Sequence, residues 1–362
     1  MDGVKHYLGI DIGSTTYKAV LLAEDGKVLR TLYKRTQPVE AAKVSCTGHC
    51  NACGRCSGGA VKRLTLEFLK VCGLTFEDIT SLVVTGSQIV EDTKKFIPFD
   101  FQVSEVTAHV AGAKFLHPDV DAIIDCGGQD SKCMVYNPPM NLWTSMMSGV
   151  CAAGTGSFLD SVAQKLGVRV EDVADKVNYD SNTEFSSVCA VLSATSINKF
   201  KNRVPIGDLL AGACKAQART ILNSVGQLLL NAPGRKILFQ GGVAFNKAVA
   251  YFLKKLTGSE IIIPQYHEVM GALGAAVIAR QLDGLRHGGK LELAKVEYEP
   301  TRGRSALLRV HSTRHDFFSK DASKPLVWRN LFYPTEILNA FGCRIRTLET
   351  YAALFGRRPA FV

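Results

Sequence analysis

The stretch Tyr7–Lys18, YLGIDIGSTTYK, joins an apolar run to an aspartate and a tip of small residues. Strand-like alternation continues to Leu22, and the turn signal EDG at Glu24–Gly26 precedes a further run over Val28–Lys34. The pattern predicts a meander of three strands whose first hairpin carries Asp11. Small residues at such a tip let backbone N–H groups approach phosphate oxygens, and a nearby carboxylate can hold Mg²⁺ through water.

The same pattern occurs again in Val120–Tyr136, VDAIIDCGGQDSKCMVY. An apolar strand ends on a carboxylate, Asp125, and is followed by Gly127, Gly128 and a second strand. Two hairpins of this kind in one chain predict a duplicated domain that clamps a nucleotide from both sides.

A third glycine pair lies in RKILFQGGVAFNKAV. We expect a strand over Lys236–Gln240, a turn at Gly241 and Gly242, and a helix over Val243–Leu256. Because glycine has no Cβ, the backbone at this turn can approach an adenosine closely. The last apolar helix, HEVMGALGAAVIARQL, should pack tightly on this loop through its small residues Gly271, Gly274 and Ala275.

Length and composition bound the class of protein. A chain of 362 residues is long enough for two packed domains and some extra. Its 46% of hydrophobic and 21% of charged residues are typical of a globular protein. The start, MDGVKHYLGI, lacks the apolar region of a signal peptide, and the apolar run Gly271–Ala279 is too short to span a bilayer. We therefore expect a cytoplasmic protein without a membrane partner.

The net charge of +10 is concentrated in the tail. From Thr301 onward there are 11 Lys/Arg and 4 Asp/Glu, which leaves 32 and 29 for the rest of the chain. A nearly neutral body does not form a groove for a polyanion, so we expect no nucleic-acid partner.

Two cysteines stand directly ahead of expected helices. Cys151 lies three residues before Gly154 in GVCAAGTGSFLD, and Cys189 lies in EFSSVCAVLSATSINKF. Helix N-termini favour thiolates, but two thiolates cannot complete an iron–sulfur site that takes four. A twofold axis between identical subunits would supply four. The sequence therefore indicates one cluster shared by a homodimer.

The order of the three glycine loops resembles the superfamily of acetate and sugar kinases, heat-shock 70 ATPases and actin, over roughly Val4–Leu285. The resemblance implies an α/β fold of two duplicated lobes, each a mixed five-stranded sheet with helices, which close on ATP and Mg²⁺. Helices are expected between the loops, and apolar spacing of three and four marks the one at Pro205–Leu230 as a core helix. They are expected near Ala60–Val71, Ser104–Leu116, Thr155–Leu166, Thr195–Lys201 and Pro205–Leu230.

Five motifs together closely resemble the ATP-dependent activators of 2-hydroxyacyl-CoA dehydratases, which share a family with the ATPase subunits of benzoyl-CoA reductase. They are GIDIGSTTYK, DCGGQDSK, CAAGTGSFLD, SSVCAVLSATSI and QGGVAFNKAV. The resemblance implies that Cys151 and Cys189 ligate a [4Fe-4S] cluster between two subunits. ATP hydrolysis would then pass one electron to a CoA-ester dehydratase or reductase, with ferredoxin or flavodoxin as the donor.

This resemblance gives each candidate site residue a role. Asp11, Asp125 and Gln129 are the expected catalytic residues. The expected nucleotide-binding residues are Gly13, Ser14, Thr15, Lys18, Gly127, Gly128, Gly154, Thr155, Gly156, Gly241, Gly242 and Asn246.

The chain departs from these activators after Cys189, where AVLSATSI replaces a segment that usually carries a pair of acidic residues. This departure favours one alternative, a weakly hydrolysing nucleotide-sensing scaffold. A phosphoryl-transfer kinase on the same fold is a second alternative.

An insertion, CTGHCNACGRC, holds four thiols in eleven residues. These suit a four-thiolate metal site, either a second iron–sulfur cluster or zinc. The ligands would be Cys46, Cys50, Cys53 and Cys56.

The chain is expected to divide into a first lobe (1–117, with the insertion at about 43–59), a second lobe (118–286) and a basic tail (287–362). The tail weakly resembles the start of a dehydratase subunit, with a short helix from Pro334 to Gly342. Core packing is expected for the thiols of Cys72, Cys126, Cys133 and Cys214.

Overall fold

The computed structural model describes residues 4–14, 16–35, 57–89, 91–128, 130–148, 155–186, 190–230, 235–286, 296–298, 326–329 and 344–347. The chain forms two compact units, Met1–Glu299 and Pro300–Val362. In the second unit, β12 (Leu326–Arg329) and β13 (Arg344–Thr347) pair in parallel. The tail helix expected from residue 334 lies outside the described residues.

The first sheet is built around β1 (His6–Ile12). The predicted meander is confirmed, because β1 pairs antiparallel with β2 (Thr16–Ala23) and β2 with β3 (Val28–Arg35). On its other side, β1 runs parallel to β4 (Ser81–Thr85), and β4 to β5 (Phe101–Gln102). The strand order is therefore β3-β2-β1-β4-β5.

The second sheet repeats this plan. Its order is β10-β9-β6-β7-β8-β11, with antiparallel pairing from β6 to β8 and parallel pairing from β6 to β10. The duplicated α/β fold with two mixed sheets is confirmed, and β11 adds a sixth strand to the expected five. The strands are β6 (Ala122–Cys126), β7 (Ser131–Asn137), β8 (Leu142–Met147), β9 (Lys236–Gln240), β10 (Glu260–Ile262) and β11 (Val296–Tyr298).

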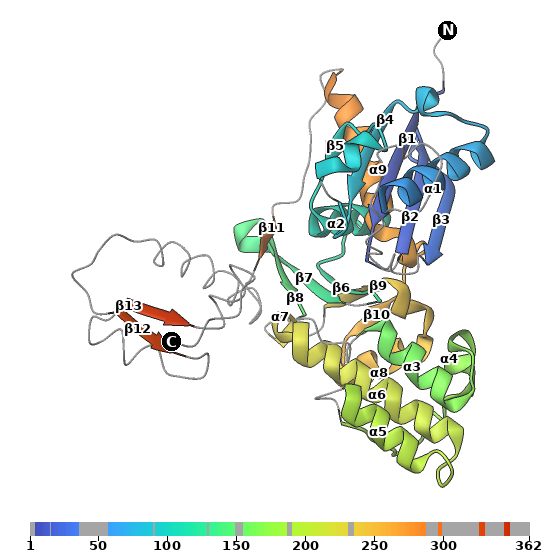
Figure 1. The fold of residues 1–362 in the computed structure, drawn as a ribbon, viewed down its shortest axis with the longest axis vertical. Coiled ribbons are helices and arrows are strands. Elements are labelled where there is room, and N and C mark those ends of the chain that lie inside the picture. Colours follow the sequence, from blue (N-terminus) through green and yellow to red (C-terminus); the bar gives the residue numbers. More distant parts are fainter. Residues whose placement is uncertain are drawn as a thin grey trace, which may run out of the picture. The chain divides into compact units, whose positions relative to one another are not determined.

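Helix α9 (Met270–Arg286) follows β10 of the second sheet in sequence but packs on the first sheet (Figure 1). A Cβ at Gly9 of β1 would overlap Ala272 of α9, and a Cβ at Gly274 would overlap the carbonyl oxygen of Ala108 in α2 (Glu105–Leu116). The prediction that the small residues of α9 pack on the Gly241 loop was therefore wrong, since they contact β1 and α2. The division of the chain after residues 117 and 286 stays a prediction.

One buried cluster unites both sheets with α2 and α9. The first sheet contributes Tyr7 and Val83, and the second contributes Ile123 and Met134. On the other face of the first sheet lies α1 (Ser57–Cys72), which confirms the helix expected there. Because α2 and α9 share one core with both sheets, they connect the two lobes physically.

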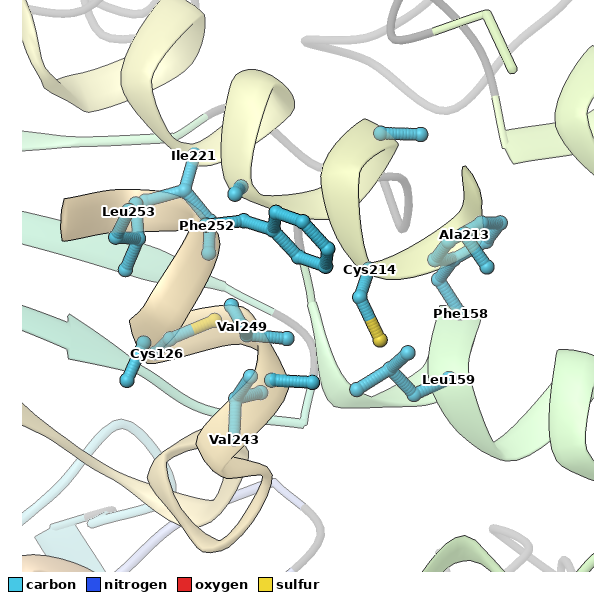
Figure 2. Packing of buried hydrophobic residues seen from close by; sticks show 14 of the residues in the cluster. Cys126, Phe158, Leu159, Ala213, Cys214, Ile221, Val243, Val249, Phe252 and Leu253 are labelled. Carbon is cyan, nitrogen blue, oxygen red and sulfur yellow. The ribbon is translucent and has the colours of Figure 1, made fainter. Parts of the chain in front are cut away.

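The helices of the second lobe enclose a separate core, shown in Figure 2. Cys126 and Cys214 lie there among aliphatic and aromatic side chains, and burial raises the pKa of both thiols to about 12. Burial raises the pKa of Cys133 to about 12 as well. Core packing is thus confirmed for these three, whereas Cys72 is half-buried.

Several helix boundaries differ from the predicted ones. The helix near Thr195 begins already at Ala190, and the one expected to reach Leu230 is interrupted at Gly226. The helix expected from Val243 starts with a 3-10 turn, because the Asn246 side chain caps the α-helix that follows. The helices are α3 (Gly156–Leu166), α4 (Val173–Lys176), α5 (Ala190–Phe200), α6 (Ile206–Val225), α7 (Gln227–Leu230) and α8 (Lys247–Thr257).

Across the described ranges, no helix is both long enough and apolar enough to cross a membrane.

Candidate functional site

The two hairpin tips have the same backbone geometry. In the first, the amide of Gly13 donates to the carbonyl of Thr16 at 2.9 Å. In the second, the amide of Gly127 donates to the carbonyl of Asp130, also at 2.9 Å. The strand register is equivalent too, with a lysine opposite each aspartate, Lys18 opposite Asp11 and Lys132 opposite Asp125. The duplication seen in the sequence therefore extends to the local structure of the site.

In the first hairpin, aspartate and lysine bond directly. Lys18 Nζ donates to Asp11 Oδ2 at 2.8 Å, and the Asp11 side chain is fully buried. Burial alone would lower the pKa of Lys18, but the carboxylates of Asp11, Asp125 and Glu105 raise it above its ordinary value. The other oxygen, Asp11 Oδ1, is buried and has no hydrogen-bond partner among the described residues. An unsatisfied buried acceptor is costly, so this oxygen fits a site for a ligand, metal-bound water or cation.

In the second hairpin, the lysine is held by other carboxylates. Lys132 Nζ lies 3.0 Å from Glu105 Oε1 and 3.1 Å from Asp130 Oδ1, but 3.8 Å from Asp125 Oδ2. The Lys132 side chain is only 1% exposed. Burial opposes its charge, but the three carboxylates outweigh it and raise its pKa. Burial likewise opposes the charge of Glu105, but Lys132 and His109 lower its pKa overall.

His109 of α2 connects the second hairpin with the third glycine loop. Its Nδ1 lies 2.7 Å from Gln240 Nε2 and 3.6 Å from Asp125 Oδ1, and its Nε2 lies 3.8 Å from Glu105 Oε1. Burial lowers the pKa of His109, but Asp125 and Glu105 raise it by more. Gln240 directly precedes Gly241, so this histidine contacts the loop expected to receive adenosine.

Four residues of this site were not predicted from the sequence: Glu105, His109, Lys132 and Gln240. Two signals were available: Lys132 repeats the position of Lys18, and Glu105 and His109 are four residues apart on one face of α2.

The third loop and the start of α3 meet the second hairpin. Gly241 has a φ of +89°, and a Cβ there would overlap the backbone of Cys126. The amide of Gly156 donates to the carbonyl of Gly127 at 2.9 Å, and that of Ser157 to the carbonyl of Gly128 at 3.1 Å. The second hairpin tip, the Gly241 turn and the start of α3 therefore converge, and the amides of Gly156 and Ser157 bond to the hairpin.

The third loop also faces the first sheet. A Cβ at Gly242 would lie 3.0 Å from the Tyr33 hydroxyl of β3. The exposed ring of Phe245 packs edge-on against Tyr33 and His267, with ring centroids 6.0 and 4.6 Å apart. The loop is thus contacted from both lobes.

Two other candidate residues hold helix ends. Asn246 Oδ1 accepts from the amide of Ala248 at 3.0 Å, and its Nδ2 faces Cys214 Sγ at 3.8 Å. The carbonyl of the fully buried Thr155 accepts from Gln217 Nε2 at 3.0 Å. The side chain of Asn246 therefore contacts α8 and the core, not the hairpins.

Nine of the expected site residues lie outside the described residues. They are Thr15, Gln129, Gly154 and the cysteines Cys46, Cys50, Cys53, Cys56, Cys151 and Cys189.

The charges around the two hairpins favour a cation. Four carboxylates (Asp11, Glu105, Asp125 and Asp130) face two lysines. Within the described ranges, no three His, Cys, Asp or Glu side chains form a metal site by themselves. Mg²⁺ usually keeps several waters and binds through one or two carboxylates and substrate phosphates. The excess of negative charge beside glycine-rich tips fits a nucleotide phosphate chain bound with Mg²⁺.

Comparison with known proteins agrees with this geometry. Residues 8–279 match the model of the BadF/BadG/BcrA/BcrD ATPase family. The chain belongs to this family. The (R)-2-hydroxyglutaryl-CoA dehydratase activating ATPase of Acidaminococcus fermentans, a relative, is 32% identical over 277 residues, which are 75% of this chain and 96% of the relative. The 2-hydroxyisocaproyl-CoA dehydratase activator of Clostridioides difficile is 30% identical over 75% of this chain and 94% of its own length.

Solved structures of BadF/BadG/BcrA/BcrD ATPase relatives show the same actin-like ATPase fold. The activator of the 2-hydroxyisocaproyl-CoA dehydratase from Clostridium difficile, with bound ADPNP, is similar with a TM-score of 0.64 and 28% identity. The similarity covers 78% of this chain and 97% of that structure. The fold implied by the three glycine loops is therefore confirmed.

Proposed function

We propose that this chain is an ATP-dependent activator that donates single electrons to a CoA-ester dehydratase or a related reductase. The paired hairpins carry the proposal, since each has a glycine tip and a buried aspartate opposite a lysine, in a member of an ATPase family. The relatives that are named as dehydratase activators support the choice of partner.

The nucleotide would lie between the two hairpins with its phosphates on the glycine tips. Backbone amides around Gly13 and Gly128 would contact phosphate oxygens, and Asp11 and Asp125 would hold the waters of Mg²⁺. The turn at Gly241 would receive the adenosine. The unsatisfied Oδ1 of Asp11 supports this arrangement most directly.

Nucleotide binding can be tested by isothermal titration calorimetry with ADPNP and Mg²⁺. The double variant Asp11→Ala, Gly128→Val removes one carboxylate and fills one tip, so we expect it to weaken binding strongly. Lys236→Met, which removes a surface ion pair with Asp119, is the control and should bind as the wild type does. Equal affinity in all three proteins would refute the placement of the nucleotide.

The electron-transfer part of the proposal rests on Cys151 and Cys189, which precede α3 and α5 in the sequence. Helices α3 and α5 contact each other, and both contact α6. We propose that each subunit of a homodimer contributes these two thiols to one [4Fe-4S] cluster, and that ferredoxin or flavodoxin is the donor. When bound, such a cluster supplies one-electron transfer.

Iron and sulfide analysis after anaerobic purification tests this part. Cys151→Ser and Cys189→Ser should each lose the bridging iron and weaken the dimer while ADPNP still binds. Cys214→Ser is the matched control, because this thiol is buried in the core and its pKa is raised to about 12. An iron-free wild-type chain that binds and hydrolyses ATP would instead indicate a kinase or a nucleotide sensor.

We also propose a second metal site at Cys46, Cys50, Cys53 and Cys56, with iron or zinc as the metal. The spacing of the four thiols supports it. Replacing all four by serine should remove this metal and leave ADPNP binding intact. Unchanged iron and zinc contents would contradict the site, and Cys72→Ser is the control.

A further inference from the structure

The two hairpins differ in one respect despite their common geometry. Lys18 bonds its own aspartate directly, at 2.8 Å. Lys132 occupies the equivalent register position but lies 3.8 Å from Asp125, beyond hydrogen-bond distance. Something therefore holds the second lysine away from the second aspartate.

Two carboxylates hold Lys132: Asp130 at the hairpin tip, whose two oxygens both lie 3.1 Å from Lys132 Nζ, and Glu105. Glu105 is the first residue of α2, and its Oε1 lies 3.0 Å from Lys132 Nζ. The side chain of Asp130 is 36% exposed against 20% for Glu105. The more buried carboxylate is the less screened of the two, so Glu105 dominates the position of Lys132.

A lysine bonded to Asp125 Oδ2 would compete with a metal ion for that oxygen, and Oδ1 already faces His109 Nδ1 at 3.6 Å. Asp11, by contrast, keeps an Oδ1 that has no partner among the described residues although Lys18 bonds its Oδ2.

The buried ammonium of Lys132 needs carboxylate partners, and after Glu105 and Asp130 the next carboxylate within reach is Asp125, at 3.8 Å. The contact with Glu105 satisfies Lys132 elsewhere. Asp125 Oδ2 is thus left without a lysine at hydrogen-bond distance.

We propose that Glu105 is a positioning residue that keeps Lys132 off Asp125, so that Asp125 stays available to the Mg²⁺ of a bound nucleotide. The inference rests on the proposed nucleotide binding. It predicts that the two residues act in opposite directions. Loss of Glu105 frees Lys132 to block Asp125, whereas loss of Lys132 leaves Asp125 open whether Glu105 is present or not.

The experiment measures ADPNP affinity by calorimetry in Mg²⁺ and in EDTA, and takes the ratio as the metal-dependent gain. Glu105→Gln should lower this gain by about tenfold or more, the size usual for groups that orient metal ligands. Adding Lys132→Met to Glu105→Gln should recover most of the loss. The surface pair Asp119→Asn, Lys236→Met is the matched control, at 3.5 Å in the same lobe, and should leave the gain unchanged.

A double variant no better than Glu105→Gln would overturn the inference, because a purely structural role of Glu105 is not relieved by removing its partner. If Glu105→Gln does not fold, Glu105→Asp decides: its shorter side chain draws the carboxylate back from Lys132, so the metal-dependent gain should fall, and an unchanged gain overturns the inference. A wild-type chain that binds no ADPNP refutes the proposed function itself. If the wild type shows the metal-dependent gain in ADPNP affinity and Glu105→Gln shows the same gain, only the positioning role of Glu105 is refuted.

Discussion

Two glycines of α9 should respond in opposite directions to the same substitution. A Cβ added at Gly284 would have no atom within 4 Å, whereas a Cβ at Gly274 would overlap the carbonyl oxygen of Ala108 and lie 2.8 Å from the amide of Gly112. Alanine in place of a helical glycine contributes up to about 1 kcal/mol of helix propensity. Gly284→Ala should therefore stabilise the fold by about 0.5 to 1 kcal/mol.

For Gly274→Ala the gain in helix propensity is outweighed by the overlap of the new methyl with the backbone of α2. Both atoms met by the new methyl belong to the α2 backbone, so the two helices must separate, and overpacking of this kind costs about 1–3 kcal/mol. The upper end of that range applies, because backbone atoms cannot rotate away as a side chain can. After the gain of about 1 kcal/mol in helix propensity, the net loss of folding stability is about 2 kcal/mol. Urea unfolding followed by circular dichroism measures both variants as shifts of the midpoint at constant slope. If Gly274→Ala stabilised the protein as Gly284→Ala does, α2 and α9 would not be in backbone contact.

Three further outcomes follow from the same structure. Gly241→Ala and Gly258→Ala both place a side chain at positive φ, at a cost of about 1 kcal/mol. Only the new methyl at Gly241 also overlaps backbone, that of Cys126, so Gly241→Ala should lower the urea midpoint more than Gly258→Ala does. Equal shifts of the two midpoints would contradict the contact with Cys126. Gly271→Ala places a methyl 2.7 Å from Asp11 Oδ2 and should weaken Mg-ADPNP binding by about tenfold in calorimetry, and an unchanged dissociation constant would count against the role of Asp11. The buried thiols of Cys126, Cys133 and Cys214 have a pKa of about 12 in the folded chain, raised from the ordinary value of 9.0 that they regain on unfolding. Their contribution to the free energy of unfolding is therefore complete below pH 9 and is lost as the pH rises toward 12. Urea midpoints at about pH 8 and about pH 10 check this, and a midpoint that does not fall would refute it.

The sequence predicted those parts of the fold that depend on neighbouring residues. Each hairpin combines alternating apolar residues with a glycine tip a few positions away, so Asp11 and Asp125 could be placed at strand ends from local pattern alone. The duplication was visible for the same reason, because one short pattern occurred twice. Helix positions were also predicted, with errors at the ends where a cap such as Asn246 decides.

The polar network of the site was not predictable in this way. Glu105 and His109 belong to a helix that is otherwise mostly apolar and buried, and only the packing of α2 against the second sheet brings them to Lys132 and Asp125. Likewise, the small residues of α9 indicated that the helix packs closely against another element, but not that this element is β1 or α2. Contacts between residues far apart in the chain are set by tertiary structure, on which local periodicity carries no information.

The packing of α9 on the first sheet has a consequence for how the chain folds during synthesis. The hydroxyl of Tyr7 in β1 donates to Asp283 of α9 at 2.9 Å, across 276 positions of sequence. The first strands leave the ribosome with one apolar face uncovered, and they can cover it only after the entire second lobe has been made. Contacts between residues so far apart in the chain form slowly, and until they form the exposed apolar surface is prone to aggregation. The first lobe to be translated therefore stays incomplete until α9 has been made.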